Sequence, residues 1–220
     1  MGEPGTLIKF GKQEHLLRLQ AEGALYLNTP EYFWQIEDEE LRGDPLDCIA
    51  KVARGPKIVI PLPDGKQVSM EGEWIYRMYP PEPEKMNIFC MFALRPLIEG
   101  NFPIDTRNFQ FGDYALFLIN PNEFMRRVQS TLKNEKINYK ADLVEYVDDK
   151  YIGELGPFKK LKKFAYQSEW RLVCPEGPSG PREILIGDIR DISVILRSDE
   201  INELIKVEFE PINSRDPSGA

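Results

Sequence analysis

The alternation of apolar and polar residues along this chain predicts strands more often than helices. Side chains of a strand point alternately to the two faces of a sheet, and short, mostly apolar runs such as residues 87–94 are typical of core strands. Asp64 and Gly65 lie between two extended runs, which predicts a β-hairpin closed by a tight turn. The predicted strands span residues 7–10, 24–28, 57–63, 67–79, 87–94, 113–119, 139–147, 164–173, 182–187, 191–198 and 206–212.

A few segments carry helical signals instead. Residues 13–22 have a partial apolar stripe and are followed by Gly23, a common helix stop. Thr29 and Pro30 are typical of a helix start. Two more helices are predicted near residues 122–136 and 199–205. The pattern predicts one α+β domain over residues 1–212, with short helices and a mainly antiparallel sheet that could be split, and a disordered tail at 213–220.

Composition narrows the function classes. The formal net charge of the 220-residue chain is -8, which argues against duplex nucleic acid and against an anionic membrane as partners. Three separated cysteines and a single histidine argue against a disulfide framework and a structural zinc site, so we expect no metal. Isolated thiols, with no signal-peptide pattern at the N-terminus and no apolar run long enough for a bilayer, favour a cytoplasmic protein.

The segment FAYQSEWRLV, residues 164–173, carries the most unusual polar pattern. Strand alternation places Gln167, Glu169 and Arg171 on one face and Trp170 on the other. The simpler interpretation is that the polar face meets water. The sharper one is that Gln167-x-Glu169 resembles the Gln/Glu-x-Glu motif of ADP-ribosyltransferases, in which a carboxylate stabilises the positive charge that develops when the bond between nicotinamide and ribose breaks.

A second block of residues lies near the N-terminus. It precedes the Gln-x-Glu motif in this chain, as a similar block does in a known family. It consists of Lys9-Phe10, Gly23, residues 25–33 and Asp44-Pro45-Leu46-Asp47. Together with residues 166–172, this block resembles a widespread bacterial domain family of unknown function that is associated with abortive infection and phage defence. The two matches bracket about three-quarters of the chain, and the layout is similar to that of the ADP-ribosyltransferase superfamily.

The resemblance implies roles for particular residues. NAD would be the substrate, Glu169 the catalytic carboxylate, Gln167 the residue on the acceptor side and Arg171 an orienting partner. Lys9 or Arg18 would contact the NAD phosphates, and Tyr26 would stack on nicotinamide. The acceptor is unknown. The sequence departs from the pattern at two places: the first strand lacks the usual His or Arg, and Gln167 replaces a glutamate.

Two other functions stay open from the sequence. A non-catalytic binding or sensor module of a defence system would use Glu169 and Arg171 as a structural pair, and the acidic segment 37–47 as a surface for a protein partner. A metal-dependent nuclease would hold Mg²⁺ at Asp44 and Asp47, although a solvated acidic loop is the simpler interpretation of that segment. The basic run at residues 159–163 is typical of a solvated face and could also form a positive rim for phosphate groups.

Overall fold

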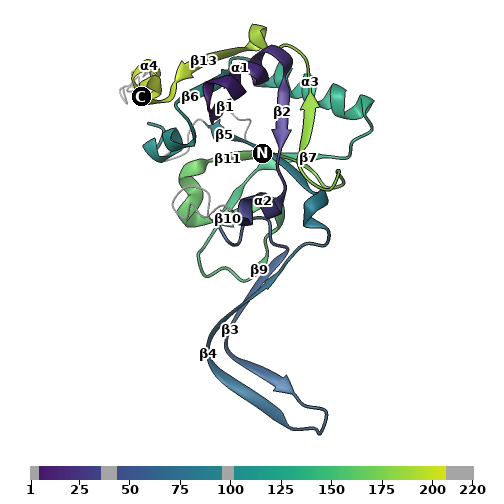
Figure 1. Ribbon diagram of the computed structural model, residues 1–220. Helices are drawn as coiled ribbons and strands as arrows, with labels where there is room; N and C mark the ends of the chain where they lie inside the picture. The colour runs from purple at the N-terminus through teal and green to yellow at the C-terminus, as the bar shows by residue number, and fades with distance from the viewer. Residues whose placement is uncertain (1–4, 36–43, 96–101, 207–220) are drawn as a thin grey trace, which may run out of the picture.

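A six-stranded antiparallel sheet forms the centre of the molecule in the computed structural model, which describes residues 5–35, 44–95 and 102–206 (Figure 1). Its strands lie in the order β13-β6-β1-β5-β11-β7, so segments far apart in the sequence become neighbours. The strands are β1 (Thr6–Gly11), β5 (Asn87–Leu94), β6 (Tyr114–Leu118), β7 (Lys140–Leu143), β11 (Glu169–Cys174) and β13 (Ser193–Arg197).

Two helices cover one face of this sheet and close the main core. Helix α1 (Gln13–Glu22) contributes Leu16 and Leu19, and α3 (Pro121–Asn134) contributes an apolar stripe that includes Phe124. Gly23 ends α1 with φ 63°, and a Cβ there would lie 2.2 Å from the carbonyl oxygen of Gly187, so only glycine fits this turn. The helix positions predicted from periodicity are therefore confirmed, and they place α1 above β1.

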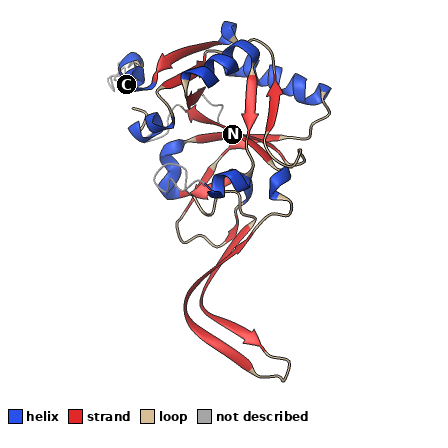
Figure 2. Cartoon of the chain, viewed as in Figure 1, coloured by secondary structure: helices blue, strands red, loops and turns tan. Residues whose placement is uncertain are grey.

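Smaller elements complete the body. Strands β2 (Ala24–Leu27) and β12 (Arg182–Leu185) form an antiparallel pair, and β8 (Glu145–Val147) pairs in parallel with β10 (Lys159–Leu161). Helices α2 (Pro30–Gln35) and α4 (Ile201–Leu204) are short, and the 3-10 helices are η1 (Pro83–Lys85), η2 (Thr106–Phe111), η3 (Gly156–Phe158), η4 (Lys162–Gln167), η5 (Arg190–Ile192) and η6 (Ser198–Glu200). Figure 2 shows that the helices gather around the body. Among the described residues, no helix is long and apolar enough to cross a membrane.

The predicted hairpin is a long arm that leaves the body (Figure 1). Strands β3 (Lys51–Pro61) and β4 (Gln67–Met78) pair with each other and are connected by the turn at Asp64 and Gly65. At the base of the arm, the first two residues of β3 also pair with the two-residue strand β9 (Gly153–Glu154). The turn was predicted correctly, but the arm begins six residues earlier than periodicity indicated, at Lys51 rather than at Lys57.

The α+β class, with mainly antiparallel strands and short helices, is confirmed, but residues 164–173 are not one strand. Residues up to Gln167 belong to η4, and β11 begins at Glu169. Between them Ser168 takes a left-handed conformation, with φ 40°, and its hydroxyl donates to the carbonyl oxygen of Ala93 at 2.7 Å. The predicted final strand at 206–212, apart from Lys206, and the predicted tail at 213–220 lie outside the described residues.

Candidate functional site

The central sheet opens between two of its strands. Strand β1 pairs with β5 over Thr6–Ile8 only, and from Ile8 to Gly11 it pairs with β6. Strand β5 pairs with β11 from Asn87 to Phe92, and near the start of β5 Ile88 bridges to Asn28, the residue after β2. The two halves of the sheet therefore diverge beyond Ile8, as a split sheet would.

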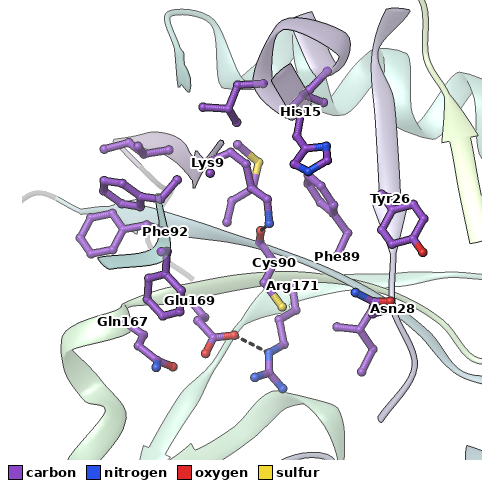
Figure 3. Close-up of a pocket in the computed structure, with 18 of the residues that line it drawn as sticks. Lys9, His15, Tyr26, Asn28, Phe89, Cys90, Phe92, Gln167, Glu169 and Arg171 are labelled. Atoms are coloured by element: carbon purple, nitrogen blue, oxygen red, sulfur yellow. Dashed lines mark hydrogen bonds and ion pairs between the residues drawn. The ribbon is translucent and has the colours of Figure 1, made fainter. Parts of the chain in front are cut away.

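A cavity of about 770 Å³ occupies this opening and is lined from both halves (Figure 3). Its volume is within the usual range for small-molecule sites, roughly 300–1,000 Å³. One side is formed by β1, α1 and β2, and the other by β5, β11 and β10. The six predicted site residues all line it: Lys9, Arg18, Tyr26, Gln167, Glu169 and Arg171.

Lys9 bridges the opening. Its ammonium donates a hydrogen bond to the carbonyl oxygen of Cys90 at 2.7 Å, and it lies 4.7 Å from the centre of the Phe89 ring. That carbonyl belongs to β5 in the part that β1 no longer pairs with. The side chain therefore replaces a missing backbone contact and places a positive charge inside the cavity.

Basic side chains on α1 line the outer part of the cavity. Lys12, His15 and Arg18 follow one another at intervals of three residues, which places them along one side of the helix. Arg18 is already engaged, since its guanidinium contacts both oxygens of Glu183 at 2.5 and 2.7 Å. His15, for which the sequence favoured a surface or half-buried structural role, is exposed, and so is Lys12; both could contact an anion.

Tyr26 provides exposed aromatic surface at the cavity, whereas Phe89 is buried and has the Lys9 ammonium over its ring. Tyr26 leaves 55% of its surface exposed although it sits in a strand, because in the described part of the chain β2 belongs to a two-stranded sheet with β12. Glu183 is its cross-strand partner, so the ring lies beside the ion pair with Arg18. An exposed ring next to a charged edge can take the flat face of a ligand.

Four charged side chains form the inner end of the cavity. Arg171 binds Asp47 with two nitrogens, at 2.7 and 2.9 Å, and its Nε donates to Glu169 at 2.7 Å. Lys160 donates to the other oxygen of Glu169 at 2.9 Å and lies 3.3 Å from Asp47. We call Asp47, Lys160, Glu169 and Arg171 the ion network; it has two charges of each sign and is almost wholly buried.

The network keeps its carboxylates ionised. Burial alone would raise the pKa of Glu169, but the charges of Arg171 and Lys160 outweigh it and lower the pKa to about 2. The pKa of Asp47 is lowered against burial by the same two cations. Burial would lower the pKa of Lys160, and the two carboxylates raise it instead. The network is therefore fully charged at neutral pH.

Gln167 and Tyr146 fix the geometry around Glu169. The side-chain oxygen of Gln167 accepts a hydrogen bond from Lys160 at 2.7 Å, so Gln167 and Glu169 share one ammonium (Figure 3 shows the two side chains side by side). The hydroxyl of Tyr146 accepts a hydrogen bond from the backbone N–H of Glu169 at 2.9 Å. The polar side chains of residues 164–173 thus contact other side chains, and the prediction that they meet water is wrong. They can be buried because ion pairs and hydrogen bonds within the network offset the cost of removing them from water.

The acidic segment and the basic run each contribute one member of this network. Asp47 and Asp44 are buried, so a solvated loop is the wrong interpretation for that end of the segment; residues 37–43 lie outside the described residues. Lys160 is buried too, although a solvated face was predicted for its run. Within the described ranges no group of three or more His, Cys, Asp or Glu side chains could hold a metal ion, and Asp47 is already bound to Arg171 and Lys160.

The thiols beside the network are not activated. Burial raises the pKa of the Cys48 thiol well above its ordinary value, and the Asp47 carboxylate adds to the effect. Burial, with a smaller contribution from Glu169, raises the pKa of Cys90 to about 12. Neither thiol has the low pKa that a nucleophilic cysteine requires.

No protein-family model, curated protein or solved structure matches this chain. The cavity and its side chains therefore carry the functional argument by themselves.

Proposed function

We propose that this protein cleaves NAD at the bond between nicotinamide and ribose and transfers the ADP-ribosyl group to an acceptor. The observation that supports the proposal is the meeting of Lys9, Tyr26 and Glu169 around one cavity, although they are up to 160 residues apart in the sequence. The resemblance of the two sequence blocks to an ADP-ribosyltransferase-like layout assigned these residues to one site. The cavity at a divergence of the sheet is consistent with that assignment.

Glu169 has the properties that this reaction asks of a carboxylate. It is ionised, because its pKa is about 2, and it lines the cavity. Each of its oxygens accepts one hydrogen bond from within the network, and an ionised carboxylate has about four acceptor positions. Glu169 can therefore accept ribose hydroxyls as well, and its negative charge lies near the sugar as positive charge develops.

The other side chains divide the substrate between them. Lys9 supplies a fixed cation at the opening, and Lys12 and His15 supply further donors for the phosphates. Tyr26 offers an exposed ring for the nicotinamide or the adenine. Glu22 and Glu183 bind three of the five N–H donors of Arg18, so the other two could contact a phosphate.

A second function has an observation of its own. Both oxygens of Glu169 are held by cations, and the network contains equal positive and negative charge. Such a network suits a structural role, in which the cavity binds a ligand and performs no chemistry. A non-catalytic binding or sensor module, in a setting such as phage defence, would have this property.

The test separates the two functions. Purified protein is incubated with NAD, with and without candidate protein and nucleic-acid acceptors, and nicotinamide release is measured by chromatography. Glu169→Gln keeps the shape of the side chain and removes its charge, and we expect a loss of at least about 100-fold in rate. Glu135→Gln, at the exposed end of α3, is the matched control and should release nicotinamide as wild type does.

Calorimetric titration with NAD decides the remaining outcomes. Binding without nicotinamide release, unaffected by Glu169→Gln, would favour the binding module. Neither binding nor release with any acceptor would overturn both the enzymatic proposal and NAD as the ligand. Circular dichroism of each variant verifies that the loss of charge at Glu169 has not unfolded the protein.

A further inference from the structure

The hairpin arm formed by β3 and β4 carries apolar surface that no other described part of the chain covers. All twelve residues of β4 are exposed, and among the described strands β3 meets one besides β4 only at Lys51 and Val52 (Figure 2). Two-stranded hairpins are marginally stable alone in water. Large apolar side chains are nevertheless exposed along the arm: Val59, Ile60, Leu62, Val68, Met70, Trp74, Ile75, Tyr76 and Met78.

The outer half of the arm has one apolar face. Ile58 lies opposite Met70 and Ile60 opposite Val68, so these four side chains share a face. The other face alternates with it and holds Lys57 opposite Glu71. An amphipathic ribbon of this kind, far from any core, is typical of a contact surface.

The charges of the arm differ in sign from those of the rest of the chain. Residues 51–78 hold five basic and three acidic side chains. The whole chain has 28 basic and 36 acidic side chains, so the remainder has 23 and 33. The arm is therefore positive by two charges, and the remainder is negative by ten. The part of the body that the structure describes is negative by three, so a second copy of this chain offers the arm a body of opposite net charge.

We propose that the arm is a dimerisation element that packs on the body of a second copy, while the arm of that copy packs on the first body. In a dimer with two-fold symmetry, each arm packs on the body of the other copy through the same contact, so neither arm stays uncovered. The ribbon from Ala53 to Leu62, which is most of the arm, is about 33 Å long at about 3.3 Å per residue, and about 10 Å wide. Burying one face of this ribbon and the matching body surface covers on the order of 700 Å² per subunit, near the ~800 Å² of a standard interface.

The first experiment measures mass in solution by sedimentation velocity over a range of concentrations. We expect wild type to have the mass of two chains, and Ile60→Glu and Val68→Glu to be monomers. Ser69→Glu adds the same charge to the other face of the arm, between Val68 and Met70, so it is the matched control and should remain a dimer. Raising NaCl from 50 to 500 mM should weaken association roughly tenfold, because opposite charges attract across the interface.

A shortened arm distinguishes packing on the body from packing of arm on arm. In this variant residues 57–71 are replaced by Asn-Gly, a two-residue hairpin turn. The shortened chain keeps its body but loses the arm, so it can form one of the two contacts with a wild-type chain. An affinity-tagged shortened chain should therefore capture untagged wild-type chain, but more weakly than affinity-tagged wild type does. No capture at all would overturn packing on the body. Monomeric wild type up to about 100 µM, open-ended polymers, or a dimer that survives both point variants would overturn the proposal.

Discussion

The ion network and the hairpin arm invert the usual distribution of polar and apolar side chains in opposite ways. In the network, four charged residues are buried where apolar residues normally lie. On the arm, residues such as Ile60, Val68 and Tyr76 are exposed where polar residues normally lie. Each arrangement costs free energy by itself.

The difference lies in how each cost is offset. The network is compensated within the chain, because every charge has an oppositely charged partner within hydrogen-bonding or ion-pair distance. The arm has no such partner in its own chain among the described residues, and its compensation has to come from another molecule. Mutations in the ion network should therefore lower the stability of the isolated chain. Mutations on the arm should affect only the association of two chains.

The largest effect should come from removing one member of the network. Arg171→Met leaves Asp47 and Glu169 buried with Lys160 as their one cation, so we expect a loss of about 3–5 kcal/mol in the free energy of unfolding. Urea denaturation followed by fluorescence measures it. Arg127→Met removes a cation that binds Glu123 and Asp191 on the surface, and it should cost less than about 1 kcal/mol.

A double variant sharpens this result. Asp47→Asn combined with Arg171→Met removes one charge of each sign and leaves Lys160 paired with Glu169. The double variant should therefore be more stable than the sum of the two single losses predicts. Strict additivity would mean that the network does not act as a unit.

Acid should weaken the network before it affects the arm. The pKa of Glu169 is lowered in the folded state, so its contribution is present above the pKa of the unfolded chain, near 4.5, and is lost as pH falls towards 2. The shift corresponds to on the order of 3 kcal/mol. We expect the free energy of unfolding to fall across that interval, and to fall less steeply in Glu169→Gln. Equal slopes in the two proteins would contradict the assignment.

Features that depend on residues adjacent in the sequence could be predicted from the sequence alone. Asp64-Gly65 specifies the turn of the arm by its own backbone preferences, and Gly23 specifies the end of α1. The separation of β1 from β5 after Ile8 was not predictable to the residue, because it depends on the register of strands about 80 residues apart. Ser168 was missed for a different reason: its left-handed conformation is maintained by contacts with Ala93 on another strand.

The site was partly predictable. The resemblance implied that Gln167, Glu169 and Arg171 belong to a site, and all three line the cavity together with Lys9 and Tyr26. Asp47 and Lys160, however, sit in segments that are respectively acidic and basic as a whole. The composition of such a segment does not indicate which single member turns inward. Only the approach of the two segments in space shows that Asp47 and Lys160 compensate Arg171 and Glu169.

At the rim of the cavity, effects on binding should separate from effects on stability. Tyr26→Ala removes a ring that is 55% exposed, so the free energy of unfolding should change by no more than about 0.5 kcal/mol. If the ring stacks on the nicotinamide or adenine, affinity for NAD should fall roughly tenfold, and Tyr26→Phe should retain it. Titration calorimetry measures both variants, and loss of affinity in Tyr26→Phe as well would point to the hydroxyl instead of the ring.

The smallest effect is expected on the arm, in the isolated chain. Ile60→Ser lies on the outer half of β3, where no other described element covers the ribbon and Ile60 is 43% exposed, so truncation should leave no cavity. At concentrations low enough to keep the protein monomeric, its free energy of unfolding should equal that of wild type within about 0.5 kcal/mol. The same comparison at high concentration should show wild type alone gaining stability, since only wild type keeps its partner. A large loss in the monomer would place Ile60 in a core and would remove the contrast between the two regions.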